Sequence, residues 1–175
     1  MPRHSRPNPA RSQAPITLDT LARLGELADA DLADRCSRRP RWTPYRGRRV
    51  AVALCQGAGL HYADGRNGVK DLDLYSFFAH DETGPFPWRW RTETVFREPP
   101  FDDHPVDFMG RSLRVDPDAE PVEAIQRYLS DRLTPTAREL AEKAVVLIEP
   151  DHLRGQVIWA RGEHVSGLDL GHRPG

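Results

Sequence analysis

Two aspartates separated by a single residue, Asp71 and Asp73, stand at the start of a hydrophobic segment. Successive side chains of a β-strand point to opposite faces, so both carboxylates would share one face, with Leu72 and Leu74 on the other. Neighbouring carboxylates repel each other unless a cation lies between them. Such pairs commonly hold Mg²⁺, which prefers oxygen ligands. The pattern therefore predicts a strand over 71–78 that begins at a metal site.

A possible phosphate-binding feature lies upstream of this pair. The segment 50–55 is continuously apolar, which is typical of a strand buried on both faces, and the sequence Gln-Gly-Ala-Gly at 56–59 interrupts it. Small residues let a phosphate approach main-chain N–H groups. Gly57 and Ala58 are therefore candidate phosphate-binding residues, although a Gly-Ala-Gly sequence is most often only a turn.

Charged residues before and after the aspartate pair extend the candidate site. Arg66 lies in a polar loop and Lys70 directly precedes the pair, so both could offset the charge of bound phosphates. Further along, Asp107 stands between Val106 and Phe108 in a predicted third strand. An acid among strand-forming hydrophobic residues is unfavourable to bury without a partner. Asp107 is therefore either paired with one of the many arginines or the third ligand of a metal site.

In order along the chain, the small-residue turn, the aspartate pair and the later acid resemble the nucleotidyltransferase superfamily that shares the polymerase β core. The family pattern is a hydrophobic residue, Gly, then Gly or Ser, a spacer of similar length, an Asp-x-Asp pair and a third acid on a later strand. The resemblance covers 50–113 and the helix before it. It implies an α+β fold, with a small mixed or antiparallel sheet and helices packed on one side.

The resemblance also implies roles for the site residues. Asp71, Asp73 and Asp107 would be the catalytic residues and the ligands of two Mg²⁺ ions, and Asp107 would help to activate the attacking hydroxyl. Gly57 would receive the triphosphate. Ala58 departs from the pattern, because it lacks the hydroxyl of the serine that often stands there.

The implied function is metal-dependent transfer of a nucleoside monophosphate from an NTP to a hydroxyl or phosphate acceptor. The missing hydroxyl at Ala58 motivates an alternative, a catalytically inactive module on the same fold that binds nucleotide or nucleic acid. A third interpretation is the nucleotidyltransferase half of a toxin–antitoxin pair, which has only fold-level analogy in its favour.

An arginine-rich segment at 37–49 precedes the first predicted strand. Its aromatic residues are Trp42 and Tyr45, and two prolines exclude a regular helix. Guanidinium groups beside aromatic rings can bind phosphates or stack on bases, which would give weak nucleic-acid contact. The other interpretation is a solvated linker that Trp42 anchors to the core. The arginines concerned are Arg38, Arg39, Arg41, Arg46, Arg48 and Arg49.

The remaining patterns predict the elements around the site. Apolar residues at helical spacing follow Thr17, a suitable N-cap, and predict an amphipathic helix that ends near Cys36. The other expected elements are a half-exposed strand at 88–96, helices that open at Pro121 and Pro135, a segment at 144–148 that fits either a helix end or a strand, and an edge strand at 156–160.

Composition limits the classes of protein that fit. With 175 residues and a net charge of −1, the chain can form one core and has no global field that draws it to nucleic acid or membrane. It has no apolar run of about eighteen residues and no secretory signal, so we expect a cytoplasmic protein. Its two cysteines make no disulfide framework. We expect one domain over 16–161, between a disordered basic tail, 1–15, and a flexible tail, 162–175.

Overall fold

The computed structural model describes residues 10–86 and 91–164, and within them seven strands form one mixed sheet in the order β3-β4-β2-β1-β5-β6-β7. Strands β2 and β4 are parallel, and the other neighbouring strands are antiparallel. The strands are β1 (Arg49–Cys55), β2 (Leu72–Ala79), β3 (Arg91–Val95), β4 (Pro105–Leu113), β5 (Ala144–Glu149), β6 (Val157–Ala160) and β7 (Glu163–His164). The helices are α1 (Leu18–Arg38), α2 (Gln56–Asp64), α3 (Pro121–Asp131) and α4 (Pro135–Ala141), with short 3₁₀ helices η1 (Pro40–Tyr45) and η2 (Asp151–Leu153).

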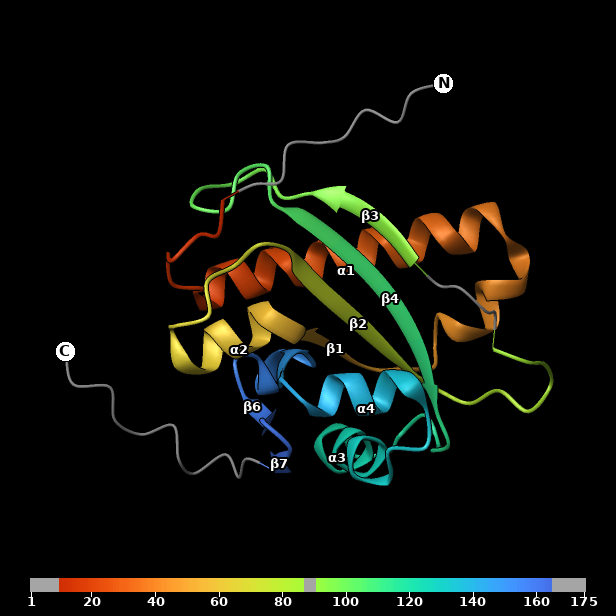
Figure 1. Cartoon of the computed structure of the whole chain (residues 1–175). Helices are drawn as coiled ribbons and strands as arrows, with labels where there is room; N and C mark the ends of the chain where they lie inside the picture. The colour runs from red at the N-terminus through yellow and green to blue at the C-terminus, as the bar shows by residue number, and fades with distance from the viewer. Residues whose placement is uncertain (1–9, 87–90, 165–175) are drawn as a thin grey trace, which may run out of the picture.

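Helices cover both faces of the sheet (Figure 1). On one face, Leu21 of α1 and Ala58 of α2 share a buried cluster with Leu54 of β1. On the opposite face, Leu129 of α3 joins a second cluster that contains Ala53 of β1. The mixed α+β class is confirmed, but the prediction of helices on one side is wrong. The physical reason is that β1 is apolar on both faces, so both must be covered to remove this surface from water.

Most elements predicted from periodicity are present. Thr17 caps α1, and its hydroxyl accepts a hydrogen bond from the main-chain N–H of Thr20 at 3.1 Å. Helices α3 and α4 begin at Pro121 and Pro135 as expected. The ambiguous segment at 144–148 is strand β5, which pairs with both β1 and β6. Of the strand expected at 88–96, residues 88–90 lie outside the described residues.

Helix α2 is the main element that the sequence analysis missed, because 56–59 and 63–68 were interpreted as a turn and a loop. Two glycines in its first turn weaken the helical pattern, since glycine has low helix propensity. Packing explains why Gly59 is there. A Cβ at this position would lie 2.9 Å from the carbonyl oxygens of both Leu54 and Ala144. Glycine therefore lets α2 pack closely against the ends of β1 and β5.

We expect Gly59→Ala to destabilise the protein by about 2 kcal/mol, because the added methyl group meets two main-chain carbonyls that cannot rotate away. Urea unfolding measures this change. Gly47→Ala is the matched control, since a Cβ there meets nothing within 4 Å. Equal stability of the two variants would contradict the packing role of Gly59.

Both ends of the described chain fall inside the predicted tails. Ser12 pairs with Val69 through main-chain hydrogen bonds of 2.8 Å in both directions, so ordered pairing begins inside the predicted N-terminal tail. Residues 1–9 and 165–175 of the predicted tails lie outside the described residues.

Cys36 and Cys55 are buried free thiols. Within the described ranges, no helix is both long and apolar enough to cross a membrane.

Candidate functional site

A row of acidic residues crosses three neighbouring strands of the sheet. Asp73 of β2 is paired with Asp107 of β4, and Asp107 is paired with Glu93 of β3. On the other side, Asp73 is paired with Cys55, the last residue of β1. Residues paired across adjacent strands project from the same face of a sheet, so these side chains stand next to one another. The structure thus brings together two of the three predicted metal ligands and adds a third acid, Glu93.

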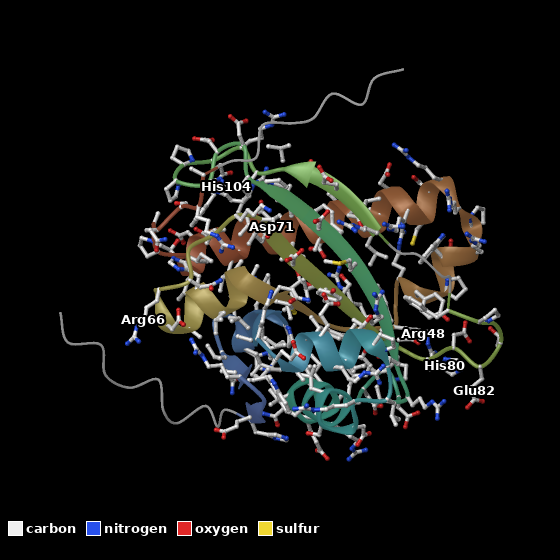
Figure 2. All side chains as sticks on the ribbon, viewed as in Figure 1. Arg48, Arg66, Asp71, His80, Glu82 and His104 are labelled. Atoms are coloured by element: carbon white, nitrogen blue, oxygen red, sulfur yellow. The ribbon has the colours of Figure 1, made fainter. Side chains whose placement is uncertain are left out.

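The acidic row lies on the face that α3 and α4 cover further along the strands. Strand alternation places Asp73 on the face of Tyr75, which belongs to the buried cluster that α3 and α4 join. Asp71 precedes β2 and is partly exposed. Figure 2 shows it at the end of β2 that lies away from α3 and α4. The acids therefore lie where the helical cover ends.

The surroundings of Asp73 disfavour its negative charge. Burial and, to a smaller extent, the negative charges of Asp71 and Asp107 raise the pKa of the Asp73 carboxyl to about 7. Lys143 and Arg91 act in the opposite direction but do not compensate. A carboxylate in this setting is stabilised either by a proton or by a nearby positive ion. Asp71, Asp73 and Asp107 thus interact electrostatically.

One carboxylate oxygen of Asp107 has no hydrogen-bond partner among the described residues. It is only 7 % exposed, and burial raises the pKa of its carboxyl, an effect that Arg91 opposes and Glu93 reinforces. One Nη atom of Arg91 lies 3.4 Å from Oδ2, while the guanidinium side chain is 69 % exposed. The other oxygen, Oδ1, is buried and accepts no hydrogen bond from the described residues. The salt bridge considered as the simple explanation for Asp107 is therefore present, but it satisfies only one of its oxygens.

The turn between β1 and α2 lies at Gln56, one residue before the predicted turn at Gly57. The left-handed residue is Gln56, with φ of 57°, and Gly57 falls in the first turn of α2. Ala58 is 1 % exposed and its methyl group packs in the core beside α1, so a hydroxyl at this position would not face a phosphate. Gly57 is partly exposed, and its main-chain oxygen accepts a hydrogen bond from Asn67 Nδ2 at 3.0 Å. The side chain of Ala58 is therefore part of the core.

The basic residues near the acids differ from those predicted. Arg66 lies past the end of α2 and points outward, away from Asp71 (Figure 2). Lys70 is exposed directly before the aspartate pair. The cations that act on Asp73 are Lys143, directly before β5, and Arg91 of β3. Sequence reasoning missed Arg91, Glu93 and Lys143, because only the strand pairing places them beside the acids.

The arginine-rich segment is largely engaged within the protein. Trp42 is 1 % exposed, and its ring meets that of Phe86 edge to face at 6.2 Å. Arg49 pairs with Asp29, and also with Glu149 at 2.5 Å. Arg48 donates hydrogen bonds to the carbonyl oxygens of Ala79 and His80. Arg48 and His80 are both labelled in Figure 2. Arg38 pairs with Asp34 at 2.9 Å, and the guanidinium of Arg41 lies 5.8 Å from the centre of the Trp42 ring. These contacts favour an anchored linker.

Two cavities lie away from the acidic row. One, of 390 Å³, lies between α1 and the start of β1 and is lined by Arg46, Arg49 and Glu149 among others. The other, of 330 Å³, borders His61 and Tyr62 of α2. In the part of the chain that the structure describes, no group of three or more His, Cys, Asp and Glu side chains is arranged to hold a metal ion. No protein-family model, curated protein or solved structure matches the chain.

Proposed function

We propose that the protein is a Mg²⁺-dependent nucleotidyltransferase that transfers a nucleoside monophosphate from an NTP to a hydroxyl or phosphate acceptor. The observation that supports the proposal most is the pairing of Asp73 with Asp107 on adjacent parallel strands, with Asp71 acting on both carboxyls. This pairing places two of the three acids named by the sequence resemblance on neighbouring strands.

The described residues contain no preformed group of three metal ligands, but three features of the acids suit Mg²⁺. The donors are carboxylate oxygens, which this hard cation prefers. Two of the acids lie on neighbouring strands of a sheet and are therefore held rigidly. The buried Oδ1 of Asp107 has no partner among the described residues, and the pKa of Asp73 is raised, so both acids would gain from an added positive charge. Asp71, Asp73 and Asp107 are the residues that would hold the ions.

The remaining parts of the site supply binding and orientation. Divalent ions, when bound at the acids, stabilise negative charge on the attacking and leaving oxygens of an in-line displacement. Asp107 would help to activate the attacking hydroxyl. The first main-chain N–H groups of α2 have no intrahelical partners and carry the positive end of the helix dipole, so they would bind phosphate oxygens next to Cys55.

The test is Mg²⁺-dependent consumption of the four ribonucleoside triphosphates with hydroxyl-bearing and phosphate-bearing acceptors. We expect pyrophosphate release with at least one nucleotide, and its loss when Mg²⁺ is chelated. Thermal unfolding with each nucleotide, with and without Mg²⁺, gives a second measurement that needs no acceptor. Absence of turnover together with a melting temperature indifferent to Mg²⁺ and nucleotide would contradict the proposal.

A further inference from the structure

Lys143 stands directly before β5, across β1 from the acidic row. Val145 of β5 is paired with Cys55, which is paired with Asp73, so the row continues from the acids across β1 to β5. Lys143 precedes Val145 by two positions and stands directly before β5, at the end of the strand nearest the row, and its positive charge acts on Asp73. The row is therefore acidic at β2, β4 and β3, and it has a basic residue beside it at β5.

Two hydrogen bonds hold the main chain of Lys143, while its side chain forms no ion pair within the described residues. Its N–H donates a hydrogen bond to the carbonyl oxygen of Leu140 at 3.3 Å, and its carbonyl oxygen accepts one from the N–H of Arg161 at 2.6 Å. The residue is exposed, and no carboxylate of residues 10–86 or 91–164 forms an ion pair with it. A lysine held at its base, with an uncommitted ammonium group, is well suited to bind an anionic ligand.

The other cations near the acids meet these requirements less well. Arg91 is already paired with Asp107. Arg66 points away from the site (Figure 2). The sequence contains 25 Lys and Arg residues together, and only Lys70 and Lys143 are lysines. Of these two, Lys143 is the one whose charge acts on Asp73.

We propose that Lys143 binds the polyphosphate of the nucleotide, which lies over the end of β1 between Lys143 and the acids. This inference rests on the proposed function. It goes beyond that function by stating which part of the substrate lies on each side of the site. The phosphates that leave the reaction lie on the β5 side, and the acceptor approaches from the β3 side, where Arg91 and Glu93 stand. The start of α2, directly after β1, contributes main-chain N–H groups to the same phosphates.

The experiment measures binding of inorganic triphosphate in the presence of Mg²⁺ by isothermal titration calorimetry. This probe carries no base or sugar, so the result does not depend on which nucleotide the protein uses. We expect Lys143→Ala to weaken binding about 10- to 100-fold, because one charge-assisted contact is lost. Lys143→Arg should bind within a few-fold of the wild type, since it keeps the charge. Arg114→Ala, which removes an exposed cation past the far end of β4, is the matched control and should change affinity less than about twofold.

Two further measurements separate failure of this inference from failure of the proposed function. Mn²⁺ binding without phosphate, followed by electron paramagnetic resonance, should be unchanged in Lys143→Ala, and the KM for the NTP should rise more than kcat falls. If the wild type turns over NTP while Lys143→Ala binds triphosphate normally, the inference is overturned and the proposed function stands. If Lys70→Ala weakens binding in its place, Lys70 is the phosphate ligand. If the wild type neither turns over NTP nor binds triphosphate, both are overturned.

Discussion

Asp73→Asn should lose activity and gain stability in the absence of metal. The substitution removes one of the two central carboxylates of the acidic row, so we expect kcat/KM to fall by about 10²–10³-fold. It also removes a charge that burial and two neighbouring acids disfavour in the folded protein. An opposite effect on activity and stability is typical of a site built for binding a cation, because the acids are selected for the ligand and not for the apo fold.

The stability gain depends on pH with a defined sign. The folded-state pKa of Asp73 is about 7, against an ordinary value of 3.8 for an aspartate side chain. Between these values the folded protein keeps a proton that the unfolded chain has released, so the Asp73 contribution to stability decreases as pH rises. The wild type and the asparagine variant should therefore have similar stability near pH 4. At pH 8 the variant should be more stable by about 2 kcal/mol, roughly half of what the full shift implies, because partial exposure screens the effect.

Urea unfolding in EDTA over this pH range measures the difference, and Asp102→Asn, a change at an exposed loop acid, is the matched control. Adding Mg²⁺ at pH 8 should raise the melting temperature of the wild type and leave Asp73→Asn nearly unchanged. A variant that is less stable than the wild type at pH 8 without metal would show that the charge of Asp73 is satisfied within the apo protein. The acidic row would then be a structural feature.

The sequence was sufficient for the parts of the site that depend on local pattern. Alternation along β2 correctly placed Leu72 and Leu74 on the face opposite Asp73, because a strand has a fixed period of two residues. The isolated acid at Asp107 was identifiable because burying a carboxylate among hydrophobic residues is unfavourable. These inferences needed no knowledge of which strands are neighbours.

The parts that failed depend on contacts between distant segments. Glu93 joins the acids only because β3 pairs with β4, and Lys143 faces them only because β5 pairs with β1. Strand order is set by the packing of the whole sheet, so neither residue carries a local signal. Gln56 illustrates a different difficulty. It adopts a left-handed conformation that glycine would adopt with less strain, so the turn falls one residue before the glycine that marks it in the sequence.

Trp42→Ala should destabilise the protein by about 4 kcal/mol, the largest loss expected from a single truncation in the arginine-rich segment. Trp42 is 1 % exposed in a cluster with Leu32, Cys36, Tyr45 and Phe78. Removing the indole leaves a large cavity between η1 and the sheet. Chemical denaturation measures the loss, and Trp42→Phe, which should cost less than half as much, gives a usable value if the alanine variant does not fold.

This prediction also decides between the two interpretations of the segment at 37–49. Arg41 is exposed and stacks on Trp42, so Arg41→Ala should change stability by less than about 1 kcal/mol if the indole serves as an anchor. Binding of a single-stranded oligonucleotide, titrated at increasing salt, tests the alternative. If the segment binds nucleic acid, Arg41→Ala should weaken binding and reduce its salt dependence. Because Arg38, Arg48 and Arg49 already have partners within the protein, we expect no measurable oligonucleotide binding, and salt-sensitive binding that Arg41→Ala abolishes would contradict the anchored linker.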